Sequence, residues 1–195
     1  MELTPAFLLR MVRETIKAPR TGAATVLRMG FAPAVGWMAL LLMAVGSTLL
    51  THISFAMMPQ DAQDFWGAAM GSPIRTAMLQ WVVLLISVHA IDKLGRWRGG
   101  VGTLGGAVIL VAWLQFILLC LQAVQLVVEI LMPSMAAMLG VLGLVLFLWL
   151  LTNFVAELHQ FRSLGMVFAG IVLTLFALSF VLATVFAMLI GTAGA

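Results

Sequence analysis

Four polar side chains recur within one long apolar stretch, where an unpartnered polar group is costly. At 100° per residue they form a single stripe on a helix: Gln115, Gln122, Gln125 and Glu129. Such a stripe could bind a cation or relay protons toward Glu129, which is the chemistry of a small transporter or channel. The alternative is structural, because glutamines also join helices by hydrogen bonds inside membranes. A second stripe in a neighbouring apolar stretch is its candidate partner: Thr76, Gln80 and Ser87.

Ionisable side chains also gather where apolar stretches end. His89 and Asp92 share one helical face at i, i+3, and Glu157 lies close to His159 in the sequence. Together these four could form a small metal or proton site, although neither HExxH nor another metal-ligand spacing is present. The alternative is that they cap helices or form ion pairs with Lys93 and Arg162.

Catalytic motifs are absent from the sequence. It contains no nucleophile elbow, no phosphate-binding loop and no pair of catalytic carboxylates. The single cysteine, Cys120, lies inside an apolar run, so the chain cannot build a disulfide or a cysteine metal site by itself. We therefore expect a protein that is not an enzyme and that has no catalytic residue, metal or cofactor.

The elements that carry these residues are long apolar segments. Hydrophobic residues make up 64% of the chain and charged residues 9%, against roughly 45–50% and 25% in soluble domains. Apolar runs near the 20-residue length of a membrane span predict an all-α integral membrane protein with a bundle of five transmembrane helices. Within a membrane domain of residues 31–195 the spans are expected at about 34–52, 74–91, 103–131, 135–156 and 164–189. Residues 59–70 are expected to form a loop or a short interfacial helix.

The positive charges predict how this bundle is oriented. In a five-span count, nine of the ten Lys and Arg residues lie on one side, and only Arg75 lies opposite. This bias places the N-terminus in the cytoplasm and the C-terminus outside. Because the basic residues flank apolar segments instead of forming a basic face, we expect no nucleic-acid partner.

Residues 1–30 are expected to form a cytoplasmic or interfacial segment. Thr4 and Pro5 are helix-start signals, and the following residues place an apolar arc opposite a cationic face. This pattern predicts an amphipathic interfacial helix on anionic headgroups; a helix docked on the bundle is the alternative. The expected lipid-surface residues are Arg10, Arg13, Lys17 and Arg20.

Three segments together resemble a known family: TIKAPRTGAATVLRM, SVHAIDKLGRWRGGVGTLGGAV and TNFVAELHQFRSLGMVFAGIVL. They are similar to the Yip (Ypt-interacting protein) domain family. The resemblance implies a five-span membrane protein, and its eukaryotic members are Golgi or endoplasmic-reticulum proteins that partner Rab-type GTPases. The compact chain, with AWLQFIL where relatives carry tyrosine and proline, is similar to the bacterial branch, which implies a bacterial inner membrane. The residues that match the family pattern are Pro19, Arg20, His89, Gly95, Gly99, Gly100, Gly102, His159 and Phe161.

These observations favour a non-enzymatic membrane scaffold or adaptor. Its expected partners are the lipid bilayer, anionic headgroups, and another membrane protein or a second copy of the chain. The alternative function is a small transporter or channel that uses the polar stripe of the third span. A transporter would need a continuous wet cavity at the middle of the membrane.

Overall fold

The computed structural model describes residues 4–58, 60, 61, 63, 64 and 71–193, and all regular structure in this part of the chain is helical. The predicted all-α class is therefore confirmed for the described residues. The question of a loop or a short helix at 59–70 falls largely outside them. The helices are α1 (Pro5–Lys17), α2 (Pro19–Arg28), α3 (Pro33–Ala56), α5 (Pro73–Trp97), α6 (Leu104–Leu131), α7 (Pro133–His159) and α8 (Leu164–Ala193).

Proline and short polar caps determine where these helices begin. Of the described helices, five start with proline, whose fixed φ suits the first helical position and whose missing N–H is not needed there. The side chains of Thr4, Ser72 and Thr103 cap α1, α5 and α6 by accepting a hydrogen bond from a backbone N–H of the first turn. Several helices are longer than the expected spans: α3 continues to Ala56 and α5 to Trp97.

Among the described residues, four helices are long and apolar enough to cross a membrane. They are α3, α5, α6 and the segment Ser134–His159 of α7. Leu164–Phe180 of α8 is a further, shorter apolar helix. Large apolar side chains cover the outside of the bundle, including Leu173 and Phe176 at more than 70% exposure, as expected of a surface solvated by lipid. The chain is thus an integral membrane protein.

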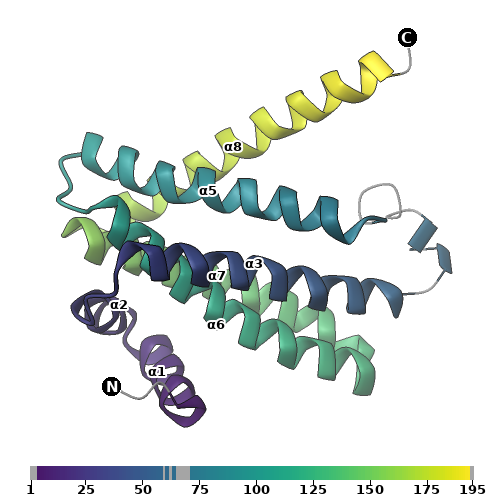
Figure 1. The fold of residues 1–195 in the computed structure, drawn as a ribbon, viewed down its shortest axis with the longest axis horizontal. Helices are drawn as coiled ribbons and strands as arrows, with labels where there is room; N and C mark the ends of the chain where they lie inside the picture. The colour runs from purple at the N-terminus through teal and green to yellow at the C-terminus, as the bar shows by residue number, and fades with distance from the viewer. Residues whose placement is uncertain (1–3, 59, 62, 65–70, 194–195) are drawn as a thin grey trace.

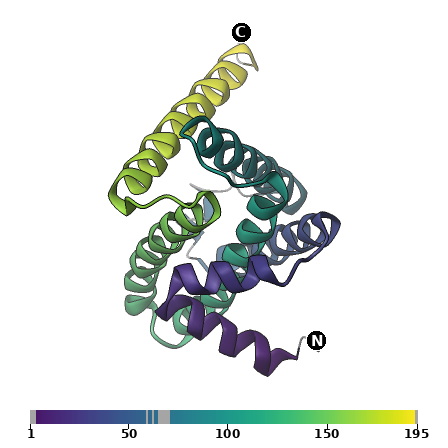
Figure 2. The same cartoon turned by 90° about the vertical axis from the view of Figure 1, so that its left-hand side faces the viewer.

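The long helices lie side by side, and α6 contacts α3, α5 and α7 (Figure 1). The core is apolar at their junction, with Val88, Val108, Leu114, Leu150 and Phe154 almost fully buried. Helix α8 packs on α7 near its start and then leaves the bundle. Helices α1 and α2 lie across one end of the bundle, where α2 packs on α6 and α7 (Figure 2).

Candidate functional site

His159 is the last residue of α7, and its side chain is buried near the end of α7 that pairs with α2 through Arg20 and Glu157. The next residue, Gln160, adopts a left-handed conformation at φ 57° and ends the helix. This turn brings Phe161 back over His159, so that the two rings stack with centroids 5.5 Å apart at 22°. The imidazole therefore lies at the turn that joins α7 to α8.

The hydrogen bonds of His159 join three parts of the chain. Its Nδ1 accepts from the backbone N–H of Gly102, at 3.2 Å, in the connection between α5 and α6. Its Nε2 lies 3.0 Å from the carbonyl oxygen of Ile91 in α5. Because Nδ1 accepts, it carries no proton, and the proton of a neutral ring is on Nε2, which donates to Ile91. One neutral side chain thus ties α7 to α5 and to the α5–α6 connection.

Three glycines leave the space that this imidazole fills, and together they form what we call the histidine cradle: Gly95, Gly100 and Gly102 around His159. A Cβ added at Gly95 or Gly100 would overlap the ring, and one at Gly102 would lie 2.6 Å from ring atom Cε1. The turn itself uses Gly99 at φ +85°, a left-handed conformation that glycine adopts without strain. At these three glycines the backbone therefore lies too close to the imidazole ring to accommodate a side chain.

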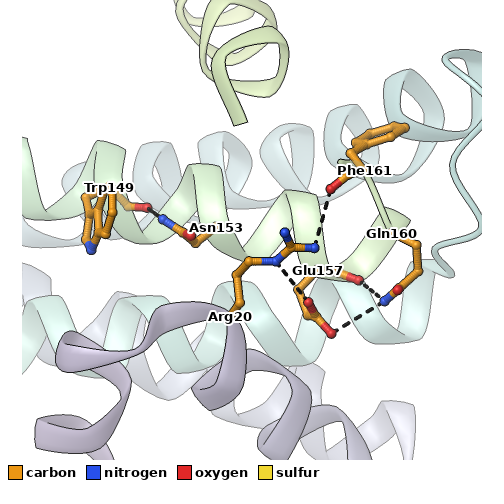
Figure 3. Close-up of polar contacts among 6 residues, drawn as sticks. All are labelled: Arg20, Trp149, Asn153, Glu157, Gln160 and Phe161. Atoms are coloured by element: carbon orange, nitrogen blue, oxygen red, sulfur yellow. Dashed lines mark hydrogen bonds and ion pairs between the residues drawn. The ribbon is translucent and has the colours of Figure 1, made fainter. Parts of the chain in front are cut away.

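Arg20 attaches α2 to the same turn (Figure 3). Its Nε lies 3.2 Å from Glu157 Oε2, and its guanidinium also donates to the carbonyl oxygen of Phe161 at 3.4 Å. Gln160 adds a 3.4 Å hydrogen bond to the other oxygen of Glu157. We call these contacts the Arg20 clamp. Arg20 was expected at the lipid surface with Arg10, Arg13 and Lys17, but its charge is directed into the protein because α2 packs on α7.

The four ionisable residues proposed as one metal or proton site lie in separate environments. His89 is exposed and bonds to Leu85 of its own helix. Asp92 is buried and pairs with Arg96, one turn further along α5. Glu157 pairs with Arg20, and His159 lies in its cradle. No three potential metal ligands converge within the described residues, and the expected partners Lys93 and Arg162 are replaced by Arg96 and Arg20.

The polar stripe on α6 is divided between two neighbouring helices. Gln122 accepts a hydrogen bond from the Ser47 hydroxyl at 2.9 Å and donates to Thr51 Oγ1 at 2.9 Å, both on α3. Gln125 reaches a backbone carbonyl of α7 at 3.5 Å. Gln115 and Glu129 form no hydrogen bond or ion pair with another described residue. Two of the four predicted residues therefore join helices.

The stripe on α5 faces α3 instead of the stripe on α6. Thr48 donates to Gln80 Oε1 at 3.1 Å, and His52 Nε2 lies 3.3 Å from Thr76 Oγ1. Ser87 bonds to its own helix at Val83. Sequence analysis did not single out the polar face of α3 that serves both neighbours. Its signal was available in the helical spacing of Ser47, Thr48, Thr51 and His52.

Two hollows in the described structure lie away from the α6 stripe. One, of about 10 Å³, is lined by apolar side chains of α5, α6 and α7. The other, of about 310 Å³, lies between α1 and α2 and is lined by residues that include Glu14, Lys17 and Thr21. Neither is lined by Gln115, Gln122, Gln125 or Glu129. The positions of these hollows and the hydrogen bonds of Gln122 and Gln125 both agree with the interpretation that the stripe joins helices.

Helix α1 is docked through the centre of its apolar face. Met11, Val12 and Thr15 are buried, and the Trp113 indole of α6 donates to Thr15 Oγ1 at 3.3 Å. Gly22 of α2 lies against Thr15, where a Cβ would come within 2.5 Å of that hydroxyl. The edge of the apolar face remains uncovered, with Leu9 at 61% and Ile16 at 39% exposure. The exposed cations Arg10, Arg13 and Lys17 lie beside this edge.

A family model described as Yip1 domain matches residues 13–186, which is most of the chain. The chain belongs to the Yip1 domain family. No curated protein and no solved structure matches it. The resemblance found in the sequence is thus confirmed, and the structure explains what its residues share. Six of the residues on which the sequence resemblance was based meet in the histidine cradle and the Arg20 clamp: Arg20, Gly95, Gly100, Gly102, His159 and Phe161.

Proposed function

We propose that this Yip1-domain protein is a non-enzymatic membrane scaffold or adaptor that engages the anionic surface of its own bilayer through α1. The observation that carries the proposal is the exposed edge of α1. The packing of α1 on the bundle buries Met11, Val12 and Thr15. It leaves Leu9 and Ile16 exposed beside three cations. An apolar edge next to a cationic face suits the boundary between headgroups and acyl chains. Each exposed Lys or Arg near such a surface contributes on the order of 1 kcal/mol.

The position of α1 along the bundle supports the same proposal. Helix α6 has 28 residues and is therefore about 42 Å long, against about 30 Å for the hydrocarbon core. Trp113, which holds α1, lies about 14 Å from the start of α6 at about 1.5 Å per residue. If the excess length protrudes at this end, Trp113 and α1 lie at the edge of the hydrocarbon core. Tryptophan is enriched at that depth.

We also propose five spans, with the N-terminus in the cytoplasm and the C-terminus outside. Helix α8 has 30 residues, which is long enough to cross a bilayer. With α8 as a fifth span, α1, α2, the α5–α6 connection and the α7–α8 connection all lie on one side of the membrane. The basic residues in these segments therefore share that side. The positive-inside rule assigns that side to the cytoplasm. We infer the bacterial inner membrane as the location, because the segments of the chain resemble the bacterial branch of the family.

The adaptor role requires a partner besides lipid, and we propose another membrane protein or a second copy of the chain. The end of the bundle that carries α1 and α2 is the surface available to it. Purification of the full chain in mild detergent should then retain a reproducible partner. Repeated isolation of the bare monomer would count against the adaptor role without affecting the lipid contact of α1. The transporter alternative gains no support from the hydrogen bonds of Gln122 and Gln125.

The lipid contact of α1 can be tested by amide hydrogen exchange on the full chain in nanodiscs. We expect residues 5–17 to exchange more slowly in nanodiscs that contain phosphatidylglycerol than in nanodiscs of phosphatidylcholine alone. The variant R10Q/R13Q/K17Q should lose this difference, whereas R10K/R13K/K17R, which keeps every charge, should retain it. Equal exchange of wild-type α1 in the two lipids would refute the electrostatic contact.

A further inference from the structure

A second surface at the same end of the bundle combines exposed apolar and basic side chains. It lies where α5 ends and the connection to α6 begins. Trp97 is 79% exposed, Val101 71% and Leu94 41%, and the cations Lys93 and Arg98 are exposed between them. Lys93 and Trp97 are four residues apart and so share one face of α5. We call these five residues the α5–α6 patch.

The backbone beneath this patch is held in place by the histidine cradle. Gly95 and Gly100 lie against the His159 ring, and Gly102 donates to it. The helix end is closed as well, because the N–H of Gly100 donates to the carbonyl oxygen of Gly95 at 2.9 Å and that of Gly99 to Arg96 at 2.9 Å. Trp97 and Val101 are therefore presented outward from a supported turn, which lowers the entropy cost of binding.

Three cations lie near the end of α5, and they differ in whether they already form an ion pair: Lys93, Arg96 and Arg98. Arg96 pairs with the buried carboxylate of Asp92. Lys93 and Arg98 form no ion pair or hydrogen bond with any described residue. Among the described residues, the other acids at this end also lie beside cations outside the patch, since Glu157 pairs with Arg20 and Glu14 lies 4.0 Å from Arg10. The patch therefore has two positive charges free to bind an anion, beside side chains that favour the acyl boundary.

We infer that the α5–α6 patch binds the headgroup of an anionic phospholipid. Lys93 and Arg98 contact the phosphate, which matches their charge, while Trp97, Leu94 and Val101 pack on the adjacent glycerol and acyl carbons. Side chains at the end of a helix point back toward its start, so Trp97 is directed toward the bilayer core and Lys93 extends its amine to the interface. This contact goes beyond the one proposed for α1 and involves none of its residues.

The test uses the full chain in mild detergent, titrated with phosphatidylglycerol or phosphatidylcholine while native mass spectrometry counts the bound lipids. All proteins carry R10Q/R13Q/K17Q, so that the cations of α1 contribute nothing to the binding of anionic lipid. We expect K93Q/R98Q to weaken phosphatidylglycerol binding by about five-fold for each charge removed. The charge-preserving variant K93R/R98K should bind within about two-fold of its parent, because the phosphate attraction depends mainly on charge. Arg75→Gln, at the other end of α5, should leave binding unchanged.

Three results would overturn the inference: unchanged phosphatidylglycerol binding in K93Q/R98Q, equal binding of phosphatidylcholine by the parent, or an equal loss in Arg75→Gln. A lowered midpoint of thermal unfolding in K93Q/R98Q with unaltered lipid binding would also overturn it, because the cations would then only stabilise the end of α5. If K93Q/R98Q fails to fold, a photoactivatable phosphatidylglycerol on the wild-type chain decides the question. Cross-links should map to residues 93–101, and their absence there would refute the site.

Discussion

A Cβ atom on Gly95 would overlap the imidazole ring of His159, although the two residues belong to α5 and α7. The approach is close because the ring lies directly on the α5 backbone, with Nε2 bonded to the carbonyl oxygen of Ile91. Neither side can move alone, since Gly100 and Gly102 hold the other edges of the ring. This contact sets how α5 and α7 meet at the end of the bundle.

Gly95→Ala is therefore expected to destabilise the protein. Alanine at an exposed helical site usually stabilises by about 0.5–1 kcal/mol relative to glycine, but here the added methyl group would force the histidine or α5 to shift, at a cost of about 1–3 kcal/mol. The free energy of unfolding in detergent, measured by denaturant titration, tests this. Gly170→Ala on α8 is the control, because apart from the nearby backbone of α8 itself no atom lies within 4 Å of its added Cβ. Equal stability of the two variants would contradict the cradle.

His159→Phe should cost more stability than the same change at His89. Phenylalanine keeps the ring but cannot bond the buried N–H of Gly102, and an unsatisfied buried polar group costs about 1–3 kcal/mol. His89 is exposed, hydrogen-bonds to Leu85 of its own helix, and has its ring 6.4 Å from that of Trp37, a contact that a phenylalanine ring can keep. His89→Phe is therefore expected to change stability by less than about 0.5 kcal/mol. Thermal unfolding of both variants in one detergent checks the difference. The prediction is wrong if the two midpoints fall together.

Arg20 and Glu157 should show measurable energetic coupling. A double-mutant cycle with Arg20→Gln and Glu157→Gln is expected to give about 1 kcal/mol, because the pair is only partly exposed and also holds the Phe161 carbonyl. Arg10 and Glu14 are 67% and 68% exposed and lie 4.0 Å apart. Their cycle should give about 0.3–0.5 kcal/mol at most. A coupling for Arg20 and Glu157 no larger than that of the exposed pair would argue against the clamp.

Gln122 and Gln115 should respond differently to replacement by leucine. Gln122→Leu removes the hydrogen bonds to Ser47 and Thr51 and should cost about 0.6–1.7 kcal/mol in a bilayer. Gln115→Leu should be neutral or stabilising, because Gln115 forms no hydrogen bond with another described residue. Unfolding of both variants in lipid bicelles by steric trapping gives the comparison. A larger loss of stability in Gln115→Leu than in Gln122→Leu would support a functional role for the polar stripe of α6.

The all-helical membrane class followed from the sequence because hydrophobic length and composition act locally. A run such as Leu104–Leu131 can satisfy its backbone in a bilayer only as a helix, and proline or a capping residue marks most helix starts. The family resemblance was also visible in three short segments of the sequence, because such a resemblance depends on the order of residues along the chain and not on their contacts in space. The expected helix ends were less accurate: α5 continues to Trp97, six residues beyond the expected end at 91.

Partner choice depended on the tertiary structure. Asp92, Glu157 and His159 are all polar residues near span ends, and nothing in the sequence says that Glu157 pairs with Arg20 from α2 or that His159 lies among glycines from α5 and the α5–α6 connection. Helical periodicity gives the direction of a side chain around its own axis. It does not identify the helix that faces it. For this reason the stripes of α5 and α6 were matched to each other, whereas in the structure residues of α3 hydrogen-bond to both.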